Sequence, residues 1–295
     1  MIIIKLQGGL GNQMFQFALA SIIAKTNKTK VLIDANFFND KVKTATFTPR
    51  DFELNIFSNN YNVANENEIK RFKQLNYFNK IKRKLNLNYP KYYSEKRFDF
   101  NPTVLKLNEP VYLEGYFQSY KYFDDQQAFV RNLFAFDSKK LDTQNKELLD
   151  KIESKNAIAI HIRRGDYVEN ASVNTFHGVC SDAYYNNAIT EVTTDLKEPL
   201  LVFFSDDIDW VKKEFMPLNF DKIFVNHNVN EHSWKDMYLM SRCKHNIIAN
   251  SSFSWWGAWL NNNPNKIVVA PQNWFSNEEI NSQTHDLIPE TWKKI

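Results

Sequence analysis

Residues 156–167 read NAIAIHIRRGDY, an apolar and β-branched run that breaks abruptly into charge. Such a run is typical of a strand buried on both faces of a parallel sheet. Similar runs follow at 200–207 (LLVFFSDD), 222–226 (KIFVN), 245–251 (HNIIANS) and 266–270 (KIVVA), and segments with helical spacing separate them. This alternation predicts an α/β layer with a parallel sheet in the second half of the chain.

The first half opens with a related pattern. IIIKL at 2–6 precedes a glycine turn, an apolar helical segment and a second apolar run, KVLIDA, at 30–35. This order predicts strand, turn, helix and strand, and VYLEGYF at 111–117 predicts a further strand. With 295 residues, 43% of them hydrophobic, the chain can form two α/β domains, which we place at residues 1–150 and 151–295.

Composition narrows the class of protein. The two cysteines, Cys180 and Cys243, lack CxxC spacing, so neither a disulfide framework nor a zinc cluster is indicated and a cytoplasmic location is expected. Lys5 and Gln7 interrupt the N-terminal apolar run, and no stretch reaches about 18 unbroken apolar residues, so we expect a soluble protein. We expect no nucleic-acid partner.

One segment is strongly basic. The segment from Lys70 to Arg97 contains ten basic residues and one acidic residue, Glu95. Interleaved aromatic and aliphatic residues predict a basic amphipathic helix or helix pair there. The segment is either a solvated helical face or a surface that docks on anionic lipid or on a pyrophosphate-linked acceptor. Peripheral contact with the inner membrane is therefore one of our expectations.

Ligands of parallel α/β sheets bind beyond the carboxyl ends of strands, so polar groups that follow apolar runs are the candidates. The first group is the turn formed by Gly8, Gly9, Gly11, Asn12 and Gln13. Glycine lets the backbone approach a ligand, and N–H groups at a helix start favour an anion or a hydroxyl-rich group. A purely structural turn is the alternative. The turn is not GxGxxG, which disfavours a nucleotide-dependent oxidoreductase.

The second group is His161, Arg163, Arg164 and Asp166, at the end of the run that opens at residue 156. On an extended strand His161 and Arg163 point to one face and Arg164 to the other, so one arginine can enter a cleft while its neighbour braces the scaffold. The planar fork of an arginine suits a diphosphate. Asp166 either holds an arginine in place or acts as a base.

Acids and hydroxyls follow two further runs. Asp206 and Asp207 could bind a metal through a nucleotide, accept hydrogen bonds from a guanine or a ribose, or cap the next helix. Residues 250–259, NSSFSWWGAW, could present hydroxyls and backbone N–H groups to phosphate, with an aromatic beside a base. The alternative is N-cap serines on a tryptophan-rich core helix, and both uses can coexist on different residues.

These segments together resemble glycosyltransferase family 11, the α-1,2-fucosyltransferases, in its bacterial branch. Similar enzymes carry GGLGNQMFQ at the start, HxRRxD, a strand ending FSDD, and NSSFSWWGAWL, in this order. EGYFQSYKYF at 114–123 and the late APQNWF extend the resemblance over roughly residues 1–275.

The resemblance implies a GT-B fold of two facing Rossmann-like domains, an acceptor-side N-terminal one and a donor-binding C-terminal one. It implies inverting transfer of fucose from GDP-β-L-fucose to a galactose hydroxyl of a glycan, in O-antigen, capsule or oligosaccharide synthesis. Arg163 is expected to clamp the β-phosphate with His161 in support, so that no metal or other cofactor is required.

The remaining site residues follow from the same resemblance. Asp166 is our candidate base, with bracing of the arginines as its alternative role. Gln118 and Tyr122 are assigned to the acceptor. The residues assigned to the donor, besides Arg163, are Gly9, Asn12, Arg164, Asp206, Asp207, Asn250, Ser251, Ser252 and Phe253.

Two alternative functions keep the same fold. One is a glycosyltransferase that uses another GDP-sugar, and the other is a noncatalytic sugar- or nucleotide-binding protein. The intact charged motifs argue against the second. The acceptor, which we expect to be galactose-containing and lipid-linked or free, is not named by the sequence.

Overall fold

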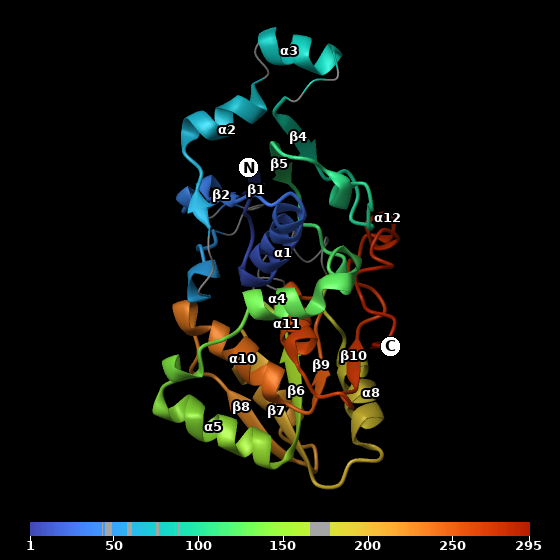
Figure 1. Cartoon of the computed structure of the whole chain (residues 1–295). Helices are drawn as coiled ribbons and strands as arrows, with labels where there is room; N and C mark the ends of the chain where they lie inside the picture. The colour runs from blue at the N-terminus through green and yellow to red at the C-terminus, as the bar shows by residue number, and fades with distance from the viewer. Residues whose placement is uncertain are drawn as a thin grey trace. The chain divides into compact units, whose positions relative to one another are not determined.

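The chain forms two α/β units (Figure 1). Unit 1 comprises Met1–Ala135 with Gln283–Leu287, and unit 2 comprises Phe136–Ser282 with Ile288–Ile295. In this computed structural model the described residues are 1–42, 44, 49–57, 61–74, 77–85, 87, 89–165 and 178–295. The expected boundary after residue 150 falls inside a helix, α5 (Thr143–Ser154), which packs on α10 (Trp234–Arg242) of unit 2.

Unit 1 is built on a parallel sheet in the order β3-β2-β1-β5-β4. Its strands are β1 (Ile2–Lys5), β2 (Val31–Asp34), β3 (Asn62–Val63), β4 (Lys91–Ser94) and β5 (Val111–Glu114). The apolar run at the N-terminus takes the central place, where Ile2, Ile3 and Ile4 are fully buried. The strands expected at 2–6, 30–35 and 111–117 are therefore confirmed. The pattern missed β3, which is two residues long and exposed, and β4, which is only partly buried.

Helices and short 3-10 turns connect these strands. α1 (Leu10–Thr26) follows the glycine turn and is buried along almost its whole length. The first part of the basic segment forms a helix pair, as expected, with α2 (Glu66–Lys73) and α3 (Tyr77–Lys84), whereas its last part contains the strand β4. The other elements of unit 1 are η1 (Asn36–Asn39), η2 (Leu54–Ile56), η3 (Val104–Lys106), η4 (Tyr120–Tyr122), η5 (Asp124–Gln126) and α4 (Gln127–Leu133).

Unit 2 has a parallel sheet in the order β11-β10-β9-β6-β7-β8. Its strands are β6 (Asn156–Ile162), β7 (Pro199–Ser205), β8 (Asp221–Val225), β9 (His245–Ile247), β10 (Val268–Ala270) and β11 (Lys293–Lys294). All five strands expected in this half are present. The remaining helices are η6 (Ser138–Lys140), α8 (Asp182–Thr193), α9 (Ile208–Phe215), η7 (Asn230–His232), α11 (Ser252–Leu260) and α12 (Glu278–Asn281).

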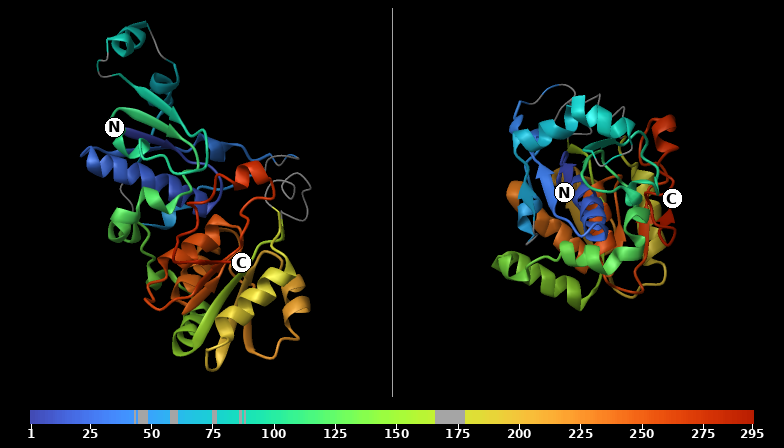
Figure 2. Two further views of the ribbon diagram at one scale, coloured as in Figure 1. Left: turned by 90° about the vertical axis from the view of Figure 1, so that its right-hand side faces the viewer. Right: turned by 45° about the horizontal axis from the view of Figure 1, so that its top comes forward.

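Helices cover both faces of the unit 2 sheet (Figure 2). Ile158, Ile160 and Ile162 of β6 point to one face and pack with apolar residues of α8 and α9. In the helical layer on the opposite face, α10 packs against both α5 and α11. The alternation along β6 leaves both faces apolar, which is why its sequence reads as an unbroken apolar run.

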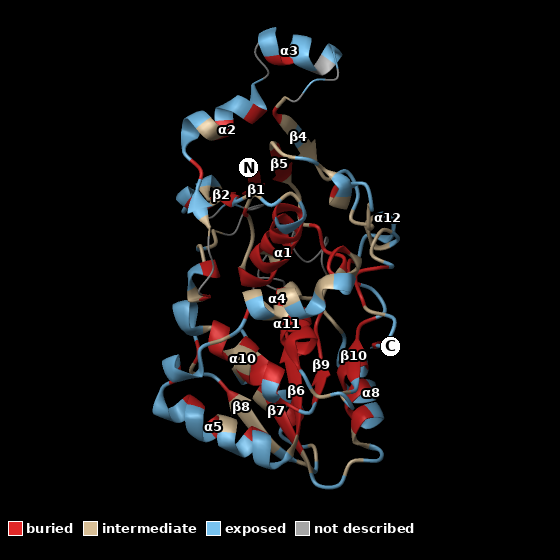
Figure 3. Ribbon diagram, in the orientation of Figure 1, coloured by how far each residue is buried: buried red, intermediate tan, exposed pale blue. Residues whose placement is uncertain are grey.

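Figure 3 shows the core as the buried centre of each sheet and its covering helices. In unit 2 the tryptophans of α11 belong to it: Trp255 and Trp256 are fully buried, and Trp255 stacks on Trp259. No helix within the described ranges is long and apolar enough to cross a bilayer.

Candidate active site

The strand order of unit 2 has a point at which the chain reverses direction across the sheet. In unit 2 the chain runs from β6 outward to β8 on one side and then returns to β9 on the other side of β6. In unit 1 the chain runs from β1 outward to β3, crosses to the opposite edge at β4 and then reaches β5, which lies beside β1. Ligands of open parallel sheets bind beyond the carboxyl ends of the strands at such points. The candidate residues are therefore those that follow β6 and β9, and those that follow β1 and β5.

Arg163 is the first residue after β6, and its guanidinium forms an ion pair with Asp206. Nη1 of Arg163 lies 3.1 Å from Oδ2 of Asp206, and both side chains are about a quarter exposed. The parallel register pairs Ile162 with Ser205, so the residues that follow these two strands are brought level with each other. Asp206 also accepts a hydrogen bond from the backbone N–H of Arg164, 2.9 Å long. One carboxylate thus fixes both the chain direction after β6 and the arginine head group.

Arg164 points to different neighbours. Its guanidinium stacks over the Trp210 ring of α9 at 3.7 Å from the centroid. Its Nε lies 3.7 Å from the Asp207 carboxylate. The two adjacent arginines therefore have separate surroundings, as expected of an extended segment.

Asp207 caps α9, because its side chain accepts a hydrogen bond of 3.2 Å from the Trp210 backbone N–H. The capping role that the sequence left open thus belongs to Asp207, whereas Asp206 pairs with Arg163. Within the described ranges, no group of three His, Cys, Asp or Glu side chains is placed to hold a metal ion.

His161 lies on β6, two residues before Arg163, and is almost completely buried. Burial lowers its pKa to about 4; the nearby Asp206 carboxylate opposes this shift and Arg163 adds to it. The imidazole is therefore neutral near pH 7. Its ring lies 5.7 Å from the Phe253 ring, and its Nδ1 is buried without a hydrogen-bond partner in the described part of the chain.

Side-chain hydrogen bonds to backbone groups hold the segment after β9. Asn250 is buried, and its amide donates to the carbonyl oxygens of Gly178 and Trp274 at 3.1 and 3.2 Å. Ser251 caps α11, with its Oγ accepting from the Phe253 N–H at 3.3 Å. Ser251, Ser252 and Phe253 are partly exposed, whereas the rest of α11 is buried. The start of α11 thus lies at the surface, and its tryptophan-rich remainder lies in the core.

In unit 1, the side chains of Asn12 and Gln13 pack and bond around the glycine turn. Gly8 has φ +77°, and a Cβ there would lie 2.3 Å from Nδ2 of Asn12. Asn12 accepts a 2.7 Å hydrogen bond from the Gln118 amide, which joins the segments that follow β1 and β5. Gln13 is fully buried and donates to the carbonyl oxygens of Gly8 and Asp51.

The remaining predicted residues lie as follows. Gly9 is the N-cap position of α1. Tyr122 is 2% exposed, and its hydroxyl accepts from the Asn101 N–H, so its ring is part of the unit 1 core. Asp166, our candidate base, lies outside the described residues.

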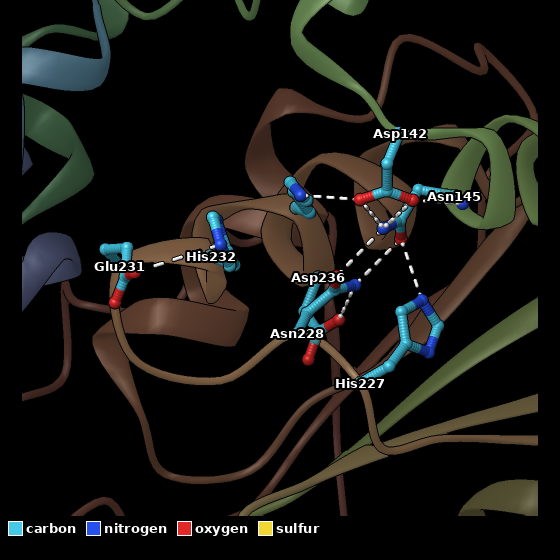
Figure 4. Close-up of polar contacts among 8 residues, drawn as sticks. Asp142, Asn145, His227, Asn228, Glu231, His232 and Asp236 are labelled. Carbon is cyan, nitrogen blue, oxygen red and sulfur yellow. Dashed lines mark hydrogen bonds and ion pairs between the residues drawn. The ribbon is translucent and has the colours of Figure 1, made fainter.

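A polar network beyond β8 was not predicted from the sequence (Figure 4). Asn228, after β8, exchanges hydrogen bonds with Asn145 of α5 and donates to Asp236 of α10 at 2.7 Å. Asp142, the cap of α5, pairs with the buried Lys235 at 2.6 Å. Burial raises the pKa of Asp236 to about 7. The only sequence signal was that polar residues follow a strand, and Asn228 lies three residues past β8 in a chain rich in asparagine.

Comparisons with known proteins agree with this architecture. The family described as Glycosyl transferase family 11 matches residues 1–295. An α-1,2-colitosyltransferase of Escherichia coli is 36% identical over 100% of this chain and 98% of its own length. The O-antigen biosynthesis glycosyltransferase WbnK of Escherichia coli is 36% identical over 95% of this chain and 97% of its own. The mouse galactoside 2-alpha-L-fucosyltransferase Sec1 is 26% identical over 88% of this chain and 64% of its own.

A solved structure of POFUT1 with GDP-fucose superposes with a TM-score of 0.52 at 13% identity, covering 91% of this chain and 97% of that one. At that identity the likeness concerns the fold alone, and it confirms the GT-B class. The full-length family match and the two relatives at 36% identity establish the activity class. The chain is a glycosyltransferase and belongs to glycosyltransferase family 11.

Proposed function

We propose that this enzyme is an inverting α-1,2-fucosyltransferase that transfers L-fucose from GDP-β-L-fucose to a galactose hydroxyl of a glycan. The observation that carries the proposal is the position of Arg163. It follows β6 at the switch point of unit 2, it is partly exposed, and Asp206 holds its guanidinium at 3.1 Å. The partly exposed first turn of α11 follows the neighbouring strand β9. A guanidinium and a helix N-terminus are both suited to a diphosphate.

The reaction itself defines what these groups must do. The acceptor hydroxyl oxygen forms a bond to the fucose anomeric carbon, and the bond from that carbon to the β-phosphate oxygen breaks on the opposite face. Negative charge therefore develops on the departing GDP, where Arg163 would stabilise it. With a cation in that place, we propose that transfer needs no metal ion. The acceptor proton requires a base, and Asp166 stays our candidate.

The other donor assignments are part of the same proposal. Ser252, Phe253 and the α11 backbone would contact phosphate or base, while Asp206 would orient Arg163. In unit 1, Asn12 would face the donor, and Gln118, bonded to it at 2.7 Å, would lie on the acceptor side. The relatives named for O-antigen biosynthesis and colitosyl transfer support a glycan acceptor in a polysaccharide repeat.

The test is transfer from GDP-fucose to a panel of galactose-terminated acceptors in excess EDTA. We expect turnover there, and we expect Arg163→Ala to lower kcat/KM by about 100-fold or more, as loss of a charge-stabilising donor does elsewhere. Arg242→Ala is the matched control, because it removes an ion-paired arginine of the same unit from the exposed side of α10. Its activity should stay near that of the unmodified enzyme.

Three results would contradict the proposal. The first is no turnover over the whole acceptor panel together with no GDP binding by calorimetry. The second is near-normal activity of Arg163→Ala in a folded protein, which would remove the phosphate clamp. The third is activity that disappears in EDTA and returns with Mg²⁺ or Mn²⁺, which would remove metal independence alone.

A second donor is favoured by a specific observation. An α-1,2-colitosyltransferase is 36% identical over the whole chain. Nucleotide-activated colitose should therefore be compared with GDP-fucose, and GDP-mannose should be added as a competitor. If kcat/KM is higher with the colitosyl donor, the proposed enzyme class and linkage stay the same, and the transferred sugar is colitose instead of fucose.

A further inference from the structure

The helix α3 leaves its apolar residues uncovered. Tyr77 and Phe78 are each 73% exposed, Leu85 is 62% exposed and Ile81 is 39% exposed. Figure 3 shows α3 exposed along almost its entire length, apart from the buried Asn79. Two aromatic rings and one aliphatic side chain on this short helix, with Leu85 directly after it, form more than the scattered apolar exposure normal for a protein surface.

The preceding helix, α2, is also basic and amphipathic, but its apolar residues are buried against the sheet of unit 1. Its Ile69 and Phe72 are 6% and 1% exposed and pack with Tyr112 of β5. Lys73 of the same helix lies over the Tyr112 ring and pairs with Asp34. Thus α2 uses its apolar face to close the unit 1 core, whereas Tyr77, Phe78 and Ile81 of α3 stay exposed among the residues that the structure describes.

The charges around this helix are of one sign. Residues 69–94 contain no Asp or Glu. Lys80, Lys82 and Lys84 are exposed on α3, and none of them forms an ion pair with any described residue. Exposed aromatic side chains flanked by lysines complement an anionic lipid surface, which takes up rings at its interface and cations at its phosphates.

We propose that α3 docks this glycosyltransferase on anionic membrane lipid, with Tyr77, Phe78, Ile81 and Leu85 entering the interface and the lysines contacting phosphate groups. A bilayer suits this element better than a protein partner does. A specific protein interface needs about 800 Å² on each side, which an eight-residue helix does not provide, whereas a lipid surface needs no matching shape. The proposal is independent of the donor and acceptor.

The experiment is co-sedimentation of the whole protein with vesicles. Vesicles made of equal parts phosphatidylglycerol and phosphatidylcholine are compared with vesicles of phosphatidylcholine alone. We expect binding to the first kind only. It should weaken strongly when salt is raised from about 0.1 M to about 1 M, because the screening length falls from about 10 Å to about 3 Å.

Variants separate the two contributions. Tyr77→Ser with Phe78→Ser should lower the vesicle partition coefficient at least about tenfold, because two rings no longer leave water. Replacing the three α3 lysines should lower it about fivefold for each residue. The lysine variant is Lys80→Gln, Lys82→Gln and Lys84→Gln, and its matched control, on exposed lysines of α5 and α9, is Lys146→Gln, Lys151→Gln and Lys213→Gln.

The outcomes are unambiguous. The control should keep its vesicle binding, and all variants should keep their melting temperature and their transfer to a soluble acceptor. Equal binding to both kinds of vesicle, no binding to either, or equal losses in the α3 and control variants would overturn the proposal. A dimer in sedimentation equilibrium that disappears in the aromatic variant would overturn it too, because a second copy would then cover α3.

Discussion

At the scale of single residues, Arg163 and Arg164 are neighbours in sequence with different surroundings. Arg163 pairs with Asp206 beyond the end of the strand, and Arg164 stacks on Trp210 and pairs with Asp207. Sequence alone identified two arginines after an apolar strand. It could not say which one braces the scaffold, because that depends on where α9 places an aromatic ring.

This difference leads to a stability prediction. Arg164→Ala removes a stacked cation and an ion pair, so we expect it to destabilise unit 2 by about 1–2 kcal/mol. Thermal melting should show this as a lower melting temperature. Trp210→Phe keeps an aromatic ring and should lose less. If Arg164→Ala melts like the unmodified protein, the stacking does not contribute to stability.

Asp236 gives a prediction about pH. Burial raises its pKa from 3.8 to about 7, and the Asn228 amide acts in the opposite direction. A raised pKa means that the folded state holds the proton more tightly, so stability contributed by this group is present below about pH 4 and is lost as the pH rises to about 7.

Asp236→Asn should remove that part of the pH dependence. We expect its melting temperature to fall less than that of the unmodified protein between about pH 5 and about pH 8. Asn can keep accepting from Asn228, so the hydrogen bond is retained. Asp150→Asn, on the exposed side of α5, is the control. Identical pH profiles for Asp236→Asn and the unmodified protein would contradict this role.

At the scale of elements, α1 begins without an acid of its own. Its first turn has no Asp or Glu, and its N-cap, Gly9, offers no side chain. Glu53 takes this place from another part of the chain, accepting from the Leu10 N–H at 2.8 Å. Its backbone N–H in turn donates to Gln13. A residue distant in sequence therefore accepts the hydrogen bond at the start of α1. The Asn12 side chain is not used for this cap and accepts from Gln118 instead.

Glu53→Ala should accordingly destabilise the start of α1 by about 1 kcal/mol, the usual effect of losing a cap and a favourable charge at a helix N-terminus. Hydrogen exchange should accelerate in the first turn of α1 and much less in its last turn. Glu66→Ala, an exposed acid in the first turn of α2, is the control and should leave α1 exchange unchanged. Uniform protection along α1 in Glu53→Ala would refute the capping role.

At the scale of the molecule, the chain returns to unit 1 near its end. Residues 283–287 belong to unit 1 although the residues on either side belong to unit 2. Asp286 is 3% exposed, and its Oδ2 accepts from the Phe100 N–H at 2.8 Å. Its carbonyl oxygen accepts from the buried Ser119 hydroxyl at 3.0 Å. Contacts across more than 160 residues of sequence thus hold the segments that follow β4 and β5.

Asp286→Ala should therefore destabilise unit 1, although the residue lies near the C-terminus. It leaves the partly buried Phe100 N–H without its acceptor, which we expect to cost about 1 kcal/mol, the low end for an unsatisfied donor. Hydrogen exchange at residues 98–101 should increase. Glu290→Ala, an exposed acid four residues later, is the control. Unchanged exchange at Phe100 would show that this segment is not held by Asp286.

By itself, the sequence determined the α/β class, the parallel strands of unit 2 and the four polar segments that follow strands. These follow from local periodicity and turn chemistry, which depend on near neighbours in the chain. The family motifs also carried the activity class. Only the tertiary structure decided that Asp207 caps α9 while Asp206 holds Arg163, that Tyr122 lies in the core, and that Asn228, Asn145 and Asp236 form a network. The cap on α9 is a local contact, but which of the two adjacent acids forms it depends on the strand register that places Asp206 beside Arg163. The bond between Asn145 and Asn228 joins side chains more than 40 residues apart, and no local pattern encodes such a distance.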